Sequence, residues 1–283
     1  MVDLFIVPLA VMAVGVWLAG VSFWTVSVFF AGVWYGARRY ADGAELDGRR
    51  FWPCSRRLWL GRCLRWVYGY QRVGRAPASR QTPVIYAVHP HGMVTAATVL
   101  TFLVDGGDSP AIMTHEYMLS VPLVPRELAL WLGCVAQGRA TARRVLREQG
   151  RSLVLVPGGK HELDRMGDPA KTHAWLLERV FPASSDWHAP LVPVWAPDEF
   201  NVTWTWRCPW PWPLSVVVQA LGRRLKWPVL QWLFIWPRCG QRRRFRVYVG
   251  RPIVPADYPT LAAFAGAYLE ELNRLKGLSG RSV

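Results

Sequence analysis

Residues 4–37 contain no charged side chain, and this uncharged run constrains the fold more than any other feature of the chain. About 20 apolar residues suffice to span a bilayer. As one straight helix the run would measure about 50 Å at ~1.5 Å per residue, which exceeds the ~30 Å hydrocarbon core. We therefore expect residues 1–37 to form a membrane anchor. It is either one tilted helix or a helical hairpin that turns near Gly15, Gly20 and Ser22.

Two other interpretations of the run fit less well. A buried core helix is the alternative, but an uncharged run of this length is uncommon in a core helix. A cleaved signal peptide is disfavoured because only Asp3, and no basic residue, precedes the run. The run is also much longer than the ~7–15 apolar residues of a signal peptide.

A basic segment follows at residues 38–80, where Arg residues far outnumber the acidic residues Asp42, Glu45 and Asp47. Aromatic and aliphatic side chains alternate with Arg between residues 51 and 68. Basic residues beside a span favour the cytosolic side and attract anionic head groups. We expect segment 38–80 to be an amphipathic element on the membrane surface. Nucleic-acid binding is the competing explanation of the charge, but no recognition motif follows, so we expect membrane lipid and no nucleic acid as partner.

The overall composition excludes three classes of protein. The chain has 283 residues, a net charge of +15 and 52% hydrophobic residues, whereas a disordered chain is poor in apolar residues. The 5 cysteines are too sparse, and odd in number, for a disulfide scaffold. A single long uncharged run argues against a polytopic transporter. Residues 81–283 are numerous enough to bury a core of their own.

Short apolar runs alternate with helical patterns in residues 81–283, as is typical of an α/β domain with a mostly parallel sheet and flanking helices. The expected strands are 83–88, 111–113, 152–156, 191–195 and 245–249. The expected helices are 96–103, 140–149 and 171–180. A last helix is expected to start after a Thr260 cap, to end at Gly277, and to bury the stripe Leu261, Phe264, Ala265, Tyr268, Leu272 and Leu275.

A tryptophan-rich region at residues 204–237 interrupts this alternation. Trp prefers the membrane–water interface, because its ring is apolar while its N–H stays hydrated. The region is therefore either a second membrane contact or the wall of a site for a lipid chain. Ordinary core aromatics in a long insertion remain the alternative.

Chemistry is expected where the first of these strands ends, in the sequence VHPHG of residues 88–92. His89 and His91 flank Pro90, and Gly92 lets the backbone approach a ligand closely. In open α/β sheets, ligands bind at the carboxyl ends of strands. The spacing alone leaves three interpretations open: a general base with a helper, half of a metal site, or two structural histidines.

Two further motifs follow strand ends. Gly158 and Gly159 leave backbone N–H groups free to face an anion, and Glu162 is placed to orient an imidazole. A simple turn is the alternative there. The strand at 191–195 is followed by Asp198 and Glu199, which is suggestive but not specific.

Taken together, these motifs resemble the type-2 diacylglycerol acyltransferase family, which also holds monoacylglycerol and wax-ester acyltransferases. The resemblance extends from the N-terminal run to about residue 255. It is carried, in this order and spacing, by YAVHPHG (86–92), EYMLS (116–120), GGKHE (158–162), LVPVW (191–195) with Glu199, and VGRPI (249–253).

The resemblance implies an enzyme that transfers a fatty acyl group from acyl-CoA to the free hydroxyl of diacylglycerol, giving triacylglycerol. Monoacylglycerol or a fatty alcohol is the alternative acceptor, and a His-x-His metal-dependent hydrolase is the alternative outside this class. The family's fold is glycerolipid-acyltransferase-like. The implied location is the endoplasmic reticulum membrane or the lipid droplet, with residues 81–283 as a catalytic domain facing the cytosol. The oligomeric state is left open.

The resemblance also implies roles for individual residues. His91 is the catalytic histidine, His89 supports it, and Glu162 is the carboxylate that orients the imidazole. Pro90, Gly92, Gly158, Gly159 and Glu199 are the expected substrate-binding residues. No metal ion and no cofactor beyond the co-substrate acyl-CoA are expected.

This sequence departs from the family pattern in ways that affect acceptor choice more than reaction class. Lys160 and His161 replace the usual small or aliphatic residues, and Asp198 begins a stretch that differs from the family's. The broader glycerolipid acyltransferases have Asp five residues after the catalytic histidine. Here that position is Ala96, so the orienting carboxylate must come from elsewhere.

Overall fold

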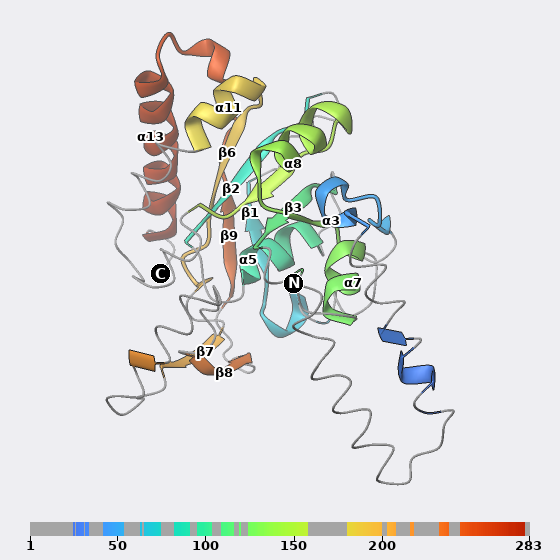
Figure 1. Cartoon of the computed structure of the whole chain (residues 1–283). Helices are drawn as coiled ribbons and strands as arrows, with labels where there is room; N and C mark the ends of the chain where they lie inside the picture. The colour runs from blue at the N-terminus through green and yellow to red at the C-terminus, as the bar shows by residue number, and fades with distance from the viewer. Residues whose placement is uncertain are drawn as a thin grey trace. The chain divides into compact units, whose positions relative to one another are not determined.

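Figure 1 shows the computed structural model of the chain, which describes residues 25, 27–30, 32–33, 42–53, 63, 65–74, 82–90, 95–103, 109–115, 119, 124–157, 180–199, 203–207, 216–217, 232–237 and 244–280. The chain divides into two compact units, Met1–Gly43 with Pro122–Val124 and Ala44–Val121 with Pro125–Val283. In the first unit, residues 25, 27–30 and 32–33 are helical. No helix within the described residues is long and apolar enough to cross a bilayer. Residues 1–24 of the expected membrane anchor lie outside them.

The described part of the second unit contains a 7-stranded sheet in the order β1-β9-β6-β2-β5-β3-β4. Its strands are β1 (Gln71–Val73), β2 (Ile85–His89), β3 (Ala111–Thr114), β4 (Cys134–Ala136), β5 (Leu153–Leu155), β6 (Leu191–Trp195) and β9 (Arg246–Val249). Strands β6, β2, β5, β3 and β4 run parallel to one another. Strand β9 pairs antiparallel with β6 and parallel with β1. The expected α/β class with a mostly parallel sheet and flanking helices is confirmed.

Helices cover both faces of this sheet, which explains why β2 is buried along its whole length and apolar up to its last residue, His89. One face packs against α8 (Arg139–Arg143), η3 (Arg144–Glu148), α11 (Phe181–Trp187) and α13 (Leu261–Gly280). The other face packs against α5 (Ala96–Thr98) and the η2 turn (Val99–Leu103) that continues it. In Figure 1, α13 lies beside β6, and α11 lies beside α13.

Helix α13 begins as expected, because Thr260 Oγ1 accepts a hydrogen bond from the Ala263 N–H at 3.1 Å. The expected buried stripe is confirmed except at Leu261, which is 41% exposed in the first turn. The expected end at Gly277 is wrong, since the helix continues to Gly280. A glycine commonly ends a helix by adopting a left-handed conformation, and Gly277 is not among the glycines with positive φ.

Part of the basic segment 38–80 belongs to this α/β unit. Helix α3 (Ala44–Asp47) packs on β4, and β1 lies at the edge of the sheet. The Trp52 N–H donates to the Trp131 carbonyl in α7 (Val124–Trp131) at 3.0 Å. The compact unit therefore begins well before residue 81, while the membrane contact of segment 38–80 stays a prediction.

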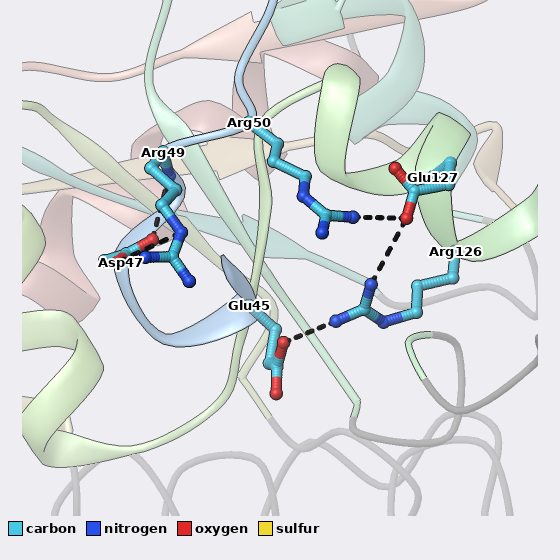
Figure 2. Close-up of polar contacts among 6 residues, drawn as sticks. All are labelled: Glu45, Asp47, Arg49, Arg50, Arg126 and Glu127. Carbon is cyan, nitrogen blue, oxygen red and sulfur yellow. Dashed lines mark hydrogen bonds and ion pairs between the residues drawn. The ribbon is translucent and has the colours of Figure 1, made fainter. Parts of the chain in front are cut away.

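An ion-pair cluster of Glu45, Arg50, Arg126 and Glu127 joins this segment to α7 (Figure 2). Arg126, whose side chain is 3% exposed, contacts Glu45 Oε2 at 2.7 Å and Glu127 Oε1 at 3.3 Å. Arg50 pairs with the same Glu127 oxygen. The two buried or half-buried cations are thus neutralised by carboxylates from two segments that lie far apart in the sequence.

The tryptophan-rich region contains a separate 2-stranded antiparallel sheet of β7 (Thr203–Arg207) and β8 (Trp232–Pro237). Trp204 pairs with Trp236, and Trp206 pairs with Phe234. Whether this region contacts lipid stays a prediction.

Candidate functional site

Strand β2 lies between β5 and β6, and the three parallel strands end at one edge of the sheet. At this carboxyl edge, the expected site residues lie at or after the ends of the strands. His89 ends β2, Pro157 precedes the glycines that come after β5, and Trp195 ends β6 ahead of Glu199. His89, Pro90 and Glu199 are described. The other expected residues, His91, Gly92, Gly158, Gly159 and Glu162, lie outside the described residues.

His89 is buried, at 2% exposure, and its ring faces α13. Its Nε2 lies 2.8 Å from the Tyr268 hydroxyl. Burial, with a smaller contribution from the positive charge of Lys276, lowers the pKa of His89 to about 3. The imidazole is therefore neutral near pH 7. The neutral ring can donate one hydrogen bond and accept another, but it does not carry the second proton that a general acid would donate.

The other ring nitrogen of His89 is Nδ1. Nδ1 is buried and forms no hydrogen bond within the described residues. Half-buried Pro90 follows through a cis peptide bond.

The side chain of Glu199 binds the N-terminal end of α5. Its side chain is 1% exposed, and its two carboxylate oxygens accept hydrogen bonds from the Ala96 N–H at 2.7 Å and the Ala97 N–H at 2.9 Å. Such bonds satisfy two of the free N–H groups that every helix start leaves, and a negative charge there is stabilised by the helix dipole.

The short turn 196–199 thereby fixes both ends of the segment that contains His91. At one end, the Ala196 N–H donates to the His89 carbonyl at 2.7 Å. At the other end, Glu199 holds the first N–H groups of α5. The turn itself is closed by the Glu199 N–H, which donates to the Ala196 carbonyl at 3.1 Å. Residues 90–95 therefore connect two points that the same four-residue turn holds in place.

A second contact joins α13 to the carboxyl edge. Lys276 Nζ lies 5.1 Å from the centre of the Trp195 ring, a cation–π contact. The indole N–H of Trp195 donates to Ser279 Oγ at 3.2 Å, and the Ser279 hydroxyl donates to the Lys276 carbonyl at 2.7 Å. His89 and Trp195 are register partners on β2 and β6, so the lysine charge is held beside the buried imidazole.

Sequence reasoning did not identify Tyr268 or Lys276 as site residues. Tyr268 appeared only as one position of an apolar stripe, and nothing in a helical pattern indicates which strand end a side chain will reach. Within the described residues, no three or more of His, Cys, Asp and Glu lie close enough together to hold a metal ion.

The chain matches no family model and no curated protein. Among solved structures it is similar to the 1-acyl-sn-glycerophosphate (LPA) acyltransferase PlsC from Thermotoga maritima, with a TM-score of 0.48 and 12% sequence identity over 100% of both chains. A likeness of this size does not establish a common activity.

Proposed function

We propose that the chain is an acyl-CoA-dependent O-acyltransferase that acylates the free hydroxyl of diacylglycerol to give triacylglycerol. The observation that supports this most is the double attachment of the HPHG segment. The turn 196–199 holds the carbonyl of His89 on one side and the start of α5 on the other. The described residues on either side of the HPHG motif are thus held by one short turn, and a general base must be positioned before its pKa matters.

In the proposed reaction, the acceptor hydroxyl oxygen attacks the thioester carbon while His91 takes the hydroxyl proton. The carbonyl electron pair moves to oxygen, and the tetrahedral intermediate then expels the coenzyme A sulfur. The imidazolium of His91 returns its proton to that sulfur. The products are an ester and a free thiol, and the histidine is neutral again. General-base assistance of this kind contributes about 10²–10⁴-fold.

Glu162 is proposed to hold the His91 imidazole in the required tautomer, as the carboxylate does in a catalytic triad. The loop 158–162 follows β5, and β5 pairs with β2. Both segments therefore leave neighbouring strands at the carboxyl edge. Backbone N–H groups of Gly158, Gly159 or Gly92 are proposed to stabilise the oxyanion.

Glu199 is proposed to act on the substrate site through the backbone. Both of its carboxylate oxygens accept hydrogen bonds from α5, so the side chain supports the loop that shapes the site. Pro90, Gly92, Gly158 and Gly159 are proposed to bind the substrates directly.

The substrates and the location follow from the same proposal. A diacylglycerol acceptor is insoluble, so the enzyme works at a membrane, which the uncharged run and the basic segment favour. We propose the endoplasmic reticulum membrane or the lipid droplet, with the catalytic unit on the cytosolic side. Monoacylglycerol and fatty alcohols remain alternative acceptors.

The direct test is acyl transfer by isolated membranes that contain the chain, with radiolabelled oleoyl-CoA and a panel of diacylglycerol, monoacylglycerol and a long-chain alcohol. Labelled triacylglycerol above the level of membranes without the chain is expected. Label appearing only in another ester would move the acceptor assignment and keep the class. No labelled ester with any acceptor would contradict the proposal, and loss of activity after exhaustive chelation would favour a metal-dependent enzyme.

A further inference from the structure

Helix α7 distributes its side chains in the opposite way to an ordinary surface helix. Its cation Arg126 is buried, whereas Leu128 is 45% and Trp131 42% exposed. These two are the only exposed residues within 126–131. A surface helix of a soluble protein turns its polar residues outward and its apolar residues inward. The inner side of α7 is apolar as expected at the fully buried Leu130, but its outer side is apolar too.

Trp52 extends this apolar surface beyond the helix. Its side chain is 48% exposed, and its ring meets the Trp131 ring edge to face, with the ring centres 6.2 Å apart. Leu128 lies three residues before Trp131, so the two side chains are neighbours on one side of the helix. We call these three residues the Trp52–Trp131 face. Single exposed apolar residues are ordinary, but adjoining ones indicate an interaction surface.

The acidic side chains beside this face are paired with arginines. Glu127, which precedes Leu128, contacts Arg126 and Arg50, and Glu45 contacts Arg126 as well (Figure 2). An unpaired charge is costly to bring near an apolar medium. The ion pairs therefore reduce the cost of placing this side of α7 against an apolar partner.

The area of the face favours a lipid surface over a second copy of the chain. Two half-exposed indoles offer about 100 Å² each, whereas a stable protein interface buries ~800 Å² per partner. The residue types also suit lipid. Trp is enriched where a bilayer meets water, because its ring is apolar while its N–H stays hydrated.

The chain connects both segments of the face to the compact unit that contains the uncharged run. That unit comprises Met1–Gly43 and Pro122–Val124. Helix α3, which leads to Trp52, begins at the residue after Gly43, and α7 begins at Val124 itself. An anchor in a bilayer keeps the segments that follow it closely along the chain near the lipid surface.

We propose that the Trp52–Trp131 face docks on the surface of a lipid bilayer, with both indoles and Leu128 at the boundary between head groups and acyl chains. The proposal rests on the membrane location in the proposed function and not on the acyl transfer itself. Such a contact holds the α/β unit at the bilayer at a second point besides the expected anchor.

The first test is photo-crosslinking of the full-length chain in phosphatidylcholine vesicles that contain radiolabelled phosphatidylcholine. The photoreactive amino acid p-benzoylphenylalanine replaces Leu128 in one chain. In the matched control it replaces Leu261, which is 41% exposed at the start of α13. Illumination joins the benzophenone to C–H groups that it touches. We expect radiolabelled lipid on the chain with the probe at position 128, and a loss of most of that label when the probe is at position 261.

The same experiment distinguishes the other occupants. A covalent dimer without labelled lipid at position 128 would assign the face to a second copy and overturn the proposal. Equal lipid labelling at both positions, or none at position 128, would overturn it as well. Flotation of the vesicles is measured first. A chain that does not float with them contradicts the membrane location in the proposed function, whereas a chain that floats without labelling at position 128 contradicts only the docking face.

The second test asks whether the tryptophans hold the face at the lipid. With the probe at position 128, Trp52→Glu combined with Trp131→Glu should lower lipid labelling to the level of position 261, because a carboxylate disfavours the acyl-chain boundary. The conservative Trp131→Tyr should keep the labelling, and so should Leu261→Glu, which adds the same charge elsewhere. Thermal unfolding shows that each variant is folded. Unchanged labelling in the folded double Glu variant would refute the role of the tryptophans.

Discussion

The ion-pair cluster and the carboxyl edge both bury polar side chains, but they satisfy them differently. In the ion-pair cluster, Arg126 and Arg50 are neutralised by Glu45 and Glu127. At the carboxyl edge, the charge of Glu199 is met by backbone N–H groups. The Nδ1 of His89 has no hydrogen-bond partner within the described residues.

This difference separates a cluster that holds segments together from an edge that retains bonding capacity. Lys276 lies against an aromatic ring, and the ion pairs found within the described residues do not include it. A group that is already paired with a full charge has little to offer a substrate. A neutral donor and a cation that are not paired with a carboxylate can still interact with a substrate. We infer that the ion-pair cluster is structural and that the carboxyl edge is the reactive region.

The largest expected effect is on the ion-pair cluster. Arg126→Met removes a cation that is 3% exposed and leaves two carboxylates without it. Breaking a buried pair in this way costs about 3–5 kcal/mol of unfolding free energy. Denaturant unfolding should show this loss, while kcat of the folded fraction stays at the wild-type level. Arg49→Met is the matched control, since Arg49 is half exposed and pairs with Asp47, two residues away in the sequence. A loss below about 1 kcal/mol for Arg126→Met would remove the distinction between the two regions.

The next effect is on pH dependence and comes from His89. Its pKa is about 3 in the folded chain and ~6.5 when unfolded, so the unfolded state binds the proton more readily. Stability is therefore complete above pH ~6.5 and falls as the pH drops from there toward about 3. Between pH 7 and pH 5 the loss from this group should be about 2 kcal/mol. Unfolding of the wild-type chain should show it, and His89→Asn should lack it. Equal slopes for both chains would mean that His89 is not buried in its neutral form.

A smaller effect is expected from Tyr268→Phe. The substitution removes the hydroxyl that contacts His89 Nε2 at 2.8 Å and leaves a second ring nitrogen unpaired. An unmade buried hydrogen bond costs about 1–2 kcal/mol. Tyr258→Phe, just before α13 in the chain, is the matched control. The Tyr258 ring packs on Phe264, and its hydroxyl forms no hydrogen bond within the described residues. Calorimetric unfolding that shows identical losses for the two variants would contradict the assigned bond.

The smallest effect is expected from Glu199→Gln. One amide oxygen can still accept a hydrogen bond from α5, but the charge at the helix start and one acceptor are lost, at a cost of about 1 kcal/mol. The neighbouring substitution Asp198→Asn removes a charge from a half-buried residue and should leave stability unchanged. If both substitutions behave alike in denaturant unfolding, the turn 196–199 does not fix the start of α5 in the way described.

Strands that are buried on both faces could be predicted from the sequence. The expected strand 191–195 coincides with β6, and 83–88, 111–113, 152–156 and 245–249 overlap β2, β3, β5 and β9. These strands are mostly short apolar runs between turn residues, a pattern that is consistent with a buried strand and too short for a typical helix. Strands β1 (QRV) and β4 (CVA) were missed because each is three residues long and lacks the run of branched apolar residues that marks β5 (LVL). Helix α11 was missed as well, and the expected helix 171–180 lies almost wholly outside the described residues.

The candidate site could be predicted only as far as its strand ends. The HPHG motif pointed to the end of β2, where His89 lies. The contacts of Tyr268 and Lys276 depend on where α13 packs, and α13 lies more than 170 residues along the chain from β2. A hydrogen bond over that separation leaves no pattern in the sequence. Likewise, the binding of Glu199 to the start of α5 follows from the path of the turn 196–199, which no residue type specifies.

The most direct test of the central claim, that the carboxyl edge is an acyl-transfer centre based on His91, is the turnover of His91→Asn. The initial rate of labelled triacylglycerol formation from oleoyl-CoA and diacylglycerol is measured for folded His91→Asn, with His188→Asn as control. His188 is exposed and ends α11 in a left-handed conformation that Asn tolerates. The account predicts at least a ~100-fold lower rate for His91→Asn and the wild-type rate for His188→Asn. A wild-type rate for His91→Asn would contradict it.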